Sequence, residues 1–320
     1  QPMQSPDGRW VLTYNGEIYN FRELRLQLES KGYQFRSNTD SEVVLHALTE
    51  WGPEAISQFN GMFAFALWDR QERRMLLARD RYGIKPLYYS FQGTRFAFAS
   101  ENKAIITHPD FHRILNKAAL YEYFTFQNIF TDQTLLSDVY ILPAGHWMVL
   151  DLADPSKRTM HQYWDFDFSE PRKELSHAEY IEELDRLFVQ AVQRQLVSDV
   201  EIGAYLSGGI ESGSITAVAS SSLPHMKSFT CGFDLSSATG LELGFDEREQ
   251  AELMSARFKT ELYEMILKSG DMERAMPKLA WHLEEPRVGQ SYPNFYAAQL
   301  ASKFVKVVLA GTGGDELFAG

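Results

Sequence analysis

The feature that most constrains this chain is the glycine- and serine-rich segment Ser207-Gly208-Gly209-Ile210-Glu211-Ser212. It follows the apolar run Val200–Leu206, which predicts a buried strand, and it precedes a helical segment at 212–220. Glycines allow positive φ, so successive backbone N–H groups can point into one concavity beside the positive end of the helix. This order predicts a loop that binds an anion such as pyrophosphate. A plain glycine turn with a serine N-cap is the open alternative.

A second loop of similar composition, Ala310-Gly311-Thr312-Gly313-Gly314-Asp315-Glu316, follows the apolar run Val305–Ala310. Its glycines permit close approach of the backbone to a nucleotide, and Asp315 could hold Mg²⁺ opposite phosphates. The alternative is a helix entry in which Asp315 and Glu316 complement the helix dipole. Two such loops in one sheet favour the nucleotide interpretation, because ligands bind at the carboxyl ends of parallel strands where the strand order reverses.

The second half of the chain, 175–320, alternates short apolar runs with helical patterns. This rhythm predicts βαβ units, and therefore a doubly wound parallel sheet with helices on both faces. The expected strands are Val200–Leu206, Phe229–Phe233, Leu262–Ile266 and Val305–Ala310. The expected helices are Ser212–Ser220, Glu247–Phe258, Met272–Leu283 and Asn294–Phe304.

The first half, residues 1–150, predicts an α+β sandwich of several short strands and a few helices. A strand at Trp10–Tyr14 is followed by the turn signal Asn15-Gly16, and Asn20 is expected to cap a helix with Glu23 as its capping-box partner. A second helix is expected from Thr39. The further strands are Met62–Trp68, Arg74–Ala78, Leu87–Phe91, Arg95–Ala99 and parts of Thr134–Leu150. The polar segment 151–174 is the expected linker.

Composition narrows the function. A net charge of -12 argues against a partner that is nucleic acid or an anionic membrane. No apolar run approaches the roughly 18 residues of a membrane-spanning helix. The single cysteine, Cys231, cannot form an internal disulfide, which favours a reducing compartment and predicts a cytoplasmic protein. The chain starts without Met and stops directly after the second glycine loop, so we expect a piece of a longer protein, cut at both ends.

The glycine loops and three segments of the first half resemble the glutamine-dependent asparagine synthetases. These segments are Tyr14–Asn20, Asn60–Phe65 and Arg79–Tyr89. The resemblance implies a class II glutamine amidotransferase domain with an N-terminal-nucleophile (Ntn) hydrolase-like fold, joined to an ATP-pyrophosphatase-type synthetase domain, each incomplete here. It also implies that glutamine supplies ammonia through an internal channel. ATP with Mg²⁺ then activates aspartate as an acyl-adenylate, and ammonia displaces AMP. The Arg79–Tyr89 block is expected to be structural.

The resemblance also implies site residues in the first half. Asn15 and Gly16 would form the oxyanion hole, with Asn15 also touching glutamine, while Glu17 and Asp40 would bind the α-amino end of glutamine. Each has an alternative: Asn15-Gly16 is also a strong type I′ hairpin signal, and Asp40 fits the acidic first turn of a helix. The nucleophilic cysteine is expected to lie upstream, so this piece alone is expected to be inactive as a glutaminase.

In the second half, Leu206 and Cys231 would flank adenine, with Cys231 alternatively a small core hydrophobe. Further ATP contacts would come from Ser207, Gly208, Gly209, Glu211, Ser212, Ala310 and Gly311. Glu211 and Asp315 would hold Mg²⁺. Two residues depart from the family pattern: Glu211 replaces the loop aspartate, and the catalytic position of the second loop holds Thr312, which carries no charge.

The sequence therefore predicts amidation of aspartate to asparagine with glutamine as nitrogen donor. The departures at Glu211 and Thr312 leave two alternatives open, which are a relative acting on another carboxylate and a non-catalytic homologue. We expect only small-molecule partners, with a homodimer possible. The eight histidines show no paired spacing typical of a zinc site.

Overall fold

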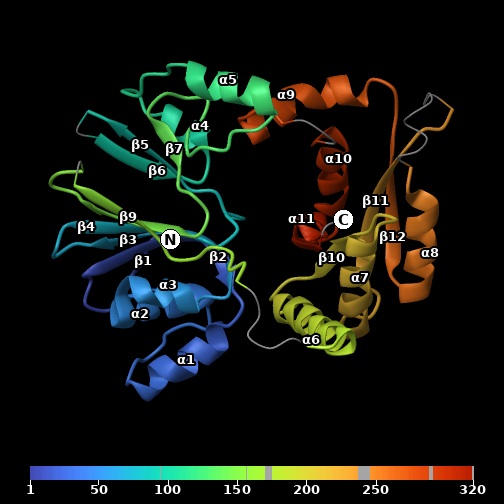
Figure 1. The fold of residues 1–320 in the computed structure, drawn as a ribbon, viewed down its shortest axis with the longest axis horizontal. Helices are drawn as coiled ribbons and strands as arrows, with labels where there is room; N and C mark the ends of the chain where they lie inside the picture. The colour runs from blue at the N-terminus through green and yellow to red at the C-terminus, as the bar shows by residue number, and fades with distance from the viewer. Residues whose placement is uncertain (94, 156, 170–174, 237–245, 288–290, 319–320) are drawn as a thin grey trace. The chain divides into compact units, whose positions relative to one another are not determined.

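The structure is a computed structural model of the 320-residue chain, and it describes all residues except 94, 156, 170–174, 237–245, 288–290 and 319–320 (Figure 1). The chain divides into two compact units, Gln1–Glu170 and Pro171–Gly320. The end of the predicted linker, 170–174, lies outside the described residues. Each unit is described by itself below.

The first unit contains two antiparallel sheets, with strand orders β1-β2-β3-β4-β8-β9 and β6-β5-β7. The strands of the larger sheet are β1 (Met3–Gln4), β2 (Trp10–Ile18), β3 (Gly61–Asp69), β4 (Arg74–Arg79), β8 (His146–Asp151) and β9 (Arg158–Gln162). Those of the smaller sheet are β5 (Tyr88–Gln92), β6 (Arg95–Ala99) and β7 (Val139–Ile141). The helices are α1 (Phe21–Ser30), α2 (Asp40–Trp51), the 3₁₀ turn η1 (Gly52–Glu54), α3 (Ala55–Gln58), α4 (Asn102–Ile106) and α5 (Lys117–Phe126).

These elements form four layers, with the two sheets between helices (Figure 1). One core cluster joins α1 and α2 to the larger sheet, and it includes Leu28, Leu48 and Phe63. A second cluster lies between the sheets, where Leu77 and Met148 are fully buried. Because β3 is covered on both faces, its sequence reads as a nearly continuous apolar run instead of an alternating one. This architecture confirms the predicted α+β sandwich.

Three local expectations for this unit are wrong. Asn15-Gly16 is not a turn but part of β2, which pairs with β3 from Trp10 to Ile18. Asn20 does precede α1, yet its side chain makes no capping bond. It instead donates to the Gln58 carbonyl and accepts from the Asn60 N–H, both at 2.9 Å. Within the predicted linker, 158–162 form β9, an edge strand whose residues are all exposed. A strand with two solvated faces has the composition of a linker.

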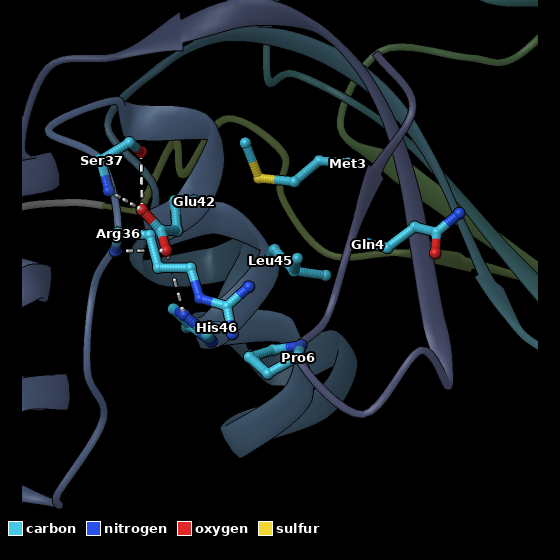
Figure 2. A pocket seen from close by; sticks show the side chains of 8 residues that line it. All are labelled: Met3, Gln4, Pro6, Arg36, Ser37, Glu42, Leu45 and His46. Carbon is cyan, nitrogen blue, oxygen red and sulfur yellow. Dashed lines mark hydrogen bonds and ion pairs between the residues drawn. The ribbon is translucent and has the colours of Figure 1, made fainter.

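Helix α2 is anchored by the buried carboxylate of Glu42. This carboxylate accepts the backbone N–H groups of Arg36 and Ser37 at 2.9 and 2.7 Å, and the Ser37 hydroxyl at 2.6 Å (Figure 2). His46, one turn further along α2, lies 3.7 Å from the same carboxylate. Together with β1 these residues line a small pocket of about 170 Å³. Since the carboxylate is satisfied by the preceding loop, its evident role is to hold 36–37 against the helix.

The second unit contains a parallel sheet with strand order β12-β11-β10-β13. Its strands are β10 (Ile202–Tyr205), β11 (Lys227–Phe233), β12 (Glu261–Leu267) and β13 (Val307–Leu309). The helices are α6 (His177–Gln195), α7 (Ile210–Ser222), α8 (Arg248–Phe258), α9 (Asp271–Leu283), α10 (Ser291–Ala301) and α11 (Gly314–Phe318). Helix α6, which starts with a capping box at Ser176 and Glu179, was missed in the sequence.

Helices cover both faces of this sheet. Ala204 packs with α6 and α7 on one face, whereas Phe229 packs with α10 on the other. Figure 1 shows α8 and α10 on opposite sides of the strands. The prediction of a doubly wound parallel sheet is therefore confirmed. The strand order reverses at β10, whose neighbours are β11 on one side and β13 on the other. Among the described residues, no helix is both long and apolar enough to span a bilayer.

Candidate functional site

The first glycine loop lies between β10 and α7, at the point where the strand order reverses. Its two serines bond to each other, because the hydroxyls of Ser207 and Ser212 are 2.9 Å apart. The Ser207 N–H donates to the Ser212 hydroxyl at 3.0 Å, and the Gly209 N–H donates to the Ser207 hydroxyl at 3.1 Å. These bonds fix the loop immediately before the N-terminus of a 13-residue helix. A helix N-terminus in this setting can take an anion.

Neither glycine of this loop has positive φ, which corrects the sequence argument, and Gly208 is needed for space instead. Gly209 has a φ of -79°, and Gly208 is not among the positive-φ residues. A Cβ at Gly208 would lie 2.6 Å from the Cβ of Gln250 on α8, so a side chain there would displace that helix. In the second loop Gly313 does have positive φ, +102°.

The two glycine loops meet at the point where the strand order reverses. A Cβ at Gly311 would lie 2.8 Å from the Cβ of Glu211 and 2.9 Å from the backbone nitrogen of Ser212. Gly314 is equally close, because a Cβ there would lie 2.7 Å from Cδ of Glu211. Glu211 is thus the residue at which segments about 100 positions apart come into contact.

The Glu211 carboxylate has an unusual environment. Its Oε1 atom is buried and has no hydrogen-bond partner among the described residues. An unpaired buried carboxylate oxygen is costly unless a cation or donor satisfies it. Together with Asp315, which is exposed, Glu211 lines a cavity of about 530 Å³ beside apolar side chains of α6 and α7.

These carboxylates fit a phosphate-bound Mg²⁺ and not a metal held by protein alone. Within the described ranges no group of three or more His, Cys, Asp or Glu could hold a metal ion. Mg²⁺ in nucleotide sites usually takes one or two carboxylates and completes its coordination with phosphates and water. Thr312 is exposed in the same loop and offers only a hydroxyl.

Of the residues predicted to flank adenine, Leu206 directly follows β10 and Cys231 lies on the neighbouring strand β11. Leu206 is only 1% exposed, and its N–H donates to the Phe229 carbonyl at 2.9 Å. Cys231 is half-buried, and burial raises the pKa of its thiol to about 11. The thiol is therefore neutral near pH 7, consistent with the alternative of a small core residue. Ala310 is exposed at the start of the second loop.

In the first unit, Asn15 and Glu17 lie on one face of β2, while Gly16 lies between them on the other. The Asn15 amide donates to the Ser100 hydroxyl at a long 3.4 Å. Gly16 allows β2 and β3 to approach closely, because a Cβ there would lie 2.7 Å from the Cα of Phe63. The hairpin alternative for Asn15-Gly16 is excluded by the continuous pairing of these strands.

Asp40 is the first residue of α2, but its carboxylate bonds to β2. Its Oδ2 accepts the Tyr14 hydroxyl at 2.7 Å and the Ile18 N–H at 3.0 Å. Burial, reinforced by the charges of Glu17 and Asp40, raises the pKa of Tyr19 to about 12 and also raises the pKa of Tyr14. The carboxylates of Glu17 and Asp40 both raise the pKa values of these two tyrosines, so the two carboxylates lie near each other in the structure. Sequence analysis missed Tyr14, although its alternation with Ile18 in the strand places both on one face.

The Arg79–Tyr89 block holds β3 in place next to β2 through Asp80. Asp80 is 1% exposed, and its carboxylate accepts four backbone N–H groups, those of Phe63, Tyr82, Ile84 and Lys85, at 3.0–3.1 Å. Phe63 is the register partner of Gly16, so Asp80 holds β3 at the position where it faces Gly16. An aspartate shortly before a glycine is typical of a turn whose N–H groups bond to the aspartate carboxylate, so the sequence Asp80–Gly83 could have indicated this role.

Comparison with known proteins identifies both halves of the chain. The family model described as "Glutamine amidotransferase domain" matches residues 1–164, and the model described as "Asparagine synthase" matches residues 183–320. A solved structure of glutamine phosphoribosylpyrophosphate amidotransferase from B. subtilis covers 82% of the chain, and the chain covers 48% of that structure, at 16% identity and a TM-score of 0.37.

Two longer relatives named asparagine synthetase match nearly the whole chain. Asparagine synthetase [glutamine-hydrolyzing] 1 of Bacillus subtilis is 33% identical over 100% of the chain, and putative asparagine synthetase [glutamine-hydrolyzing] 2 of Methanocaldococcus jannaschii is 33% identical over 97%. The chain spans 49% and 58% of these relatives, so it corresponds to about half their length. With both family models matched in order, the chain belongs to the glutamine-hydrolysing asparagine synthetase family.

Proposed function

We propose that this chain contributes to the ATP-dependent amidation of a carboxylate, with glutamine as nitrogen donor and aspartate as the acceptor that yields asparagine. The observation that carries the proposal is the meeting of the two glycine loops at Glu211, at the reversal point of a parallel sheet. Residues 1–150 are the proposed amidotransferase domain and 175–320 the first part of the synthetase domain. The reaction is assigned to the cytoplasm, with small-molecule partners and a homodimer as the proposed assembly.

In the synthetase unit, each loop has a separate task. The Ser207–Ser212 loop and the N-terminus of α7 would bind the pyrophosphate part of ATP through backbone N–H groups. Glu211 and Asp315 would hold Mg²⁺. Leu206, Cys231, Ala310 and Gly311 would contact the nucleotide. When bound, MgATP supplies the activating group that turns the carboxylate into an acyl-adenylate.

In the amidotransferase unit, the geometry supports binding and polarisation of glutamine. The Asn15 amide and the backbone of Gly16 would donate hydrogen bonds to the oxyanion that develops on the glutamine amide carbon. Asp40, oriented by Tyr14, and Glu17 would pair with the α-ammonium group of glutamine. Asp80 keeps β3, and with it the position of Gly16, in place.

A second candidate keeps the chemistry but changes the acceptor to another carboxylate. Thr312 favours it, because it replaces the acidic residue expected at the catalytic position of the second loop. A hydroxyl can donate a hydrogen bond, but it cannot take a proton at neutral pH.

The test is ATP–pyrophosphate exchange by the protein at its natural length, measured with a panel of carboxylic acids. Exchange that depends on L-aspartate, followed by asparagine formation from ammonia, supports the main proposal. Exchange with a different acid transfers the proposal to that acceptor. If no acid supports exchange while the protein remains folded, the protein is a non-catalytic homologue and the proposal is wrong.

A further inference from the structure

The contact between Glu211 and Gly314 has a consequence for this chain in particular. A Cβ on Gly314 would lie 2.7 Å from Cδ and 3.0 Å from Cγ of Glu211, and it would overlap Oε1. The carboxylate therefore occupies the volume that any side chain at 314 would fill. The buried Oε1 has no hydrogen-bond partner in the described part of the chain. Packing against Gly314, and not a hydrogen-bond donor, therefore fixes the position of this oxygen.

The length of the side chain makes this fit specific. The family pattern has an aspartate at the position of Glu211, and glutamate reaches one methylene further. The extra reach brings the carboxylate against the second loop, where only glycine leaves room. Gly314 has no conformational need to be glycine, because it lies in the helical residues of α11 and is not among the positive-φ glycines. At such a position alanine would stabilise the chain, because it lowers the conformational entropy of the unfolded state.

We infer that Gly314 is a positioning residue for the Glu211 carboxylate. By leaving the space that this carboxylate occupies, Gly314 fixes where the charge of Glu211 lies and allows glutamate to serve in place of aspartate. The link to ATP rests on the proposed function, in which Glu211 holds Mg²⁺. The contact itself does not rest on it. Because the clashing atoms belong to the end of a flexible side chain, alanine at 314 would displace the carboxylate without unfolding the loop.

The test is a cycle of four proteins: the native chain, Gly314→Ala, Glu211→Asp and the double variant. Thermal unfolding is measured first, without metal or nucleotide. In the Glu211→Asp background Gly314→Ala raises the Tm, because alanine lowers the entropy of the unfolded chain there without a clash. In the native background the same substitution raises the Tm less or lowers it, because alanine must displace the Glu211 carboxylate. Glu316→Asp combined with Gly314→Ala is the matched control, since it shortens an exposed carboxylate of α11 and is expected to give additive shifts.

Calorimetric binding of MgATP is the second measurement. Gly314→Ala is expected to weaken binding about tenfold, and the double variant to return to within about threefold of Glu211→Asp. If the native chain binds no MgATP, the proposed function loses its support, whereas the Tm cycle still decides the inference. If the Tm shifts are additive, so that Gly314→Ala raises the Tm equally in the native and the Glu211→Asp backgrounds, then Gly314 does not position the Glu211 carboxylate and the inference is wrong.

Discussion

Replacing Asp80 by asparagine tests how the first unit holds β3 at the position where it faces Gly16 of β2. The Asp80 carboxylate accepts two N–H groups on each oxygen, from Tyr82 and Ile84 on one and from Phe63 and Lys85 on the other. Asparagine keeps the shape but has only one carbonyl oxygen. Its NH₂ group then faces two buried N–H donors that have nothing to bond to.

The structure sets the size of the effect. A hydrogen bond to a charged group contributes about 1.5–3 kcal/mol, so losing two at a site that is 1% exposed costs about 3–6 kcal/mol. A domain is typically stable by only about 5–15 kcal/mol. Asp80→Asn is therefore expected to remove a large part of the stability of the first unit. In a protein active at its natural length, it should also reduce glutamine hydrolysis.

The assay is urea unfolding of Asp80→Asn beside Asp110→Asn, with hydrogen exchange at the Phe63 amide as a local readout. Asp110 is the matched control because it forms an exposed ion pair with Arg95, and exposed pairs contribute about 0–1 kcal/mol. We expect the midpoint to fall sharply only for Asp80→Asn, with faster exchange at Phe63. A loss of less than about 1 kcal/mol would refute the argument that four backbone donors depend on this carboxylate.

Three further predictions concern charge and chemistry. Burial by itself would raise the pKa of Glu42, but hydrogen bonds from Ser37 and the neighbouring backbone outweigh it and hold this pKa below its ordinary value. Glu42 therefore stabilises the fold above the ordinary pKa of a glutamate and loses this contribution as the pH falls through its lowered pKa. Glu42→Gln should flatten the acid limb of a Tm–pH profile, and an unchanged limb contradicts this assignment. Asp315→Asn should reduce ATP–pyrophosphate exchange far more than Glu316→Gln, and equal effects would remove the metal role. Chain 1–320 should show no iodoacetamide-sensitive glutaminase activity, because its single cysteine, Cys231, has a pKa raised by burial to about 11; sensitive ammonia release would contradict this.

Local patterns predicted the strands of the second unit well, because each strand there is a separate apolar run, whereas the long and largely polar helix α6 was missed. The segment Ser207–Ser212 could be placed at a strand-to-helix junction from sequence alone, and the structure has it there, although α7 begins at Ile210 and not at Ser212. What the sequence could not provide was the reason for each glycine. Gly208 is required by a side chain on α8, more than 40 residues away, and no local pattern contains that neighbour.

The same limit explains the errors in the first unit. Asn15-Gly16 has the composition of a tight turn, but nine residues of β2 pair with β3, and this long-range ladder overrides the local preference. Gly16 is glycine because β3 passes close to it. The exposed strand β9 has the sequence of a linker because an edge strand with two solvated faces carries no apolar alternation.

The two departures from the family pattern have different physical consequences. At Glu211 the charge is kept and moved by one methylene, and Gly314 provides the space that the longer side chain needs. At Thr312 the charge is lost, and its neighbours in the loop, Gly311 and Gly313, carry no side chain that could replace it. The carboxylates that face phosphates in the proposed function are thus retained as a pair, Glu211 and Asp315, while the group expected to act on the reacting carboxylate is not. We therefore expect ATP binding to be the retained part of the site, and the acceptor to be the part in which this chain has diverged.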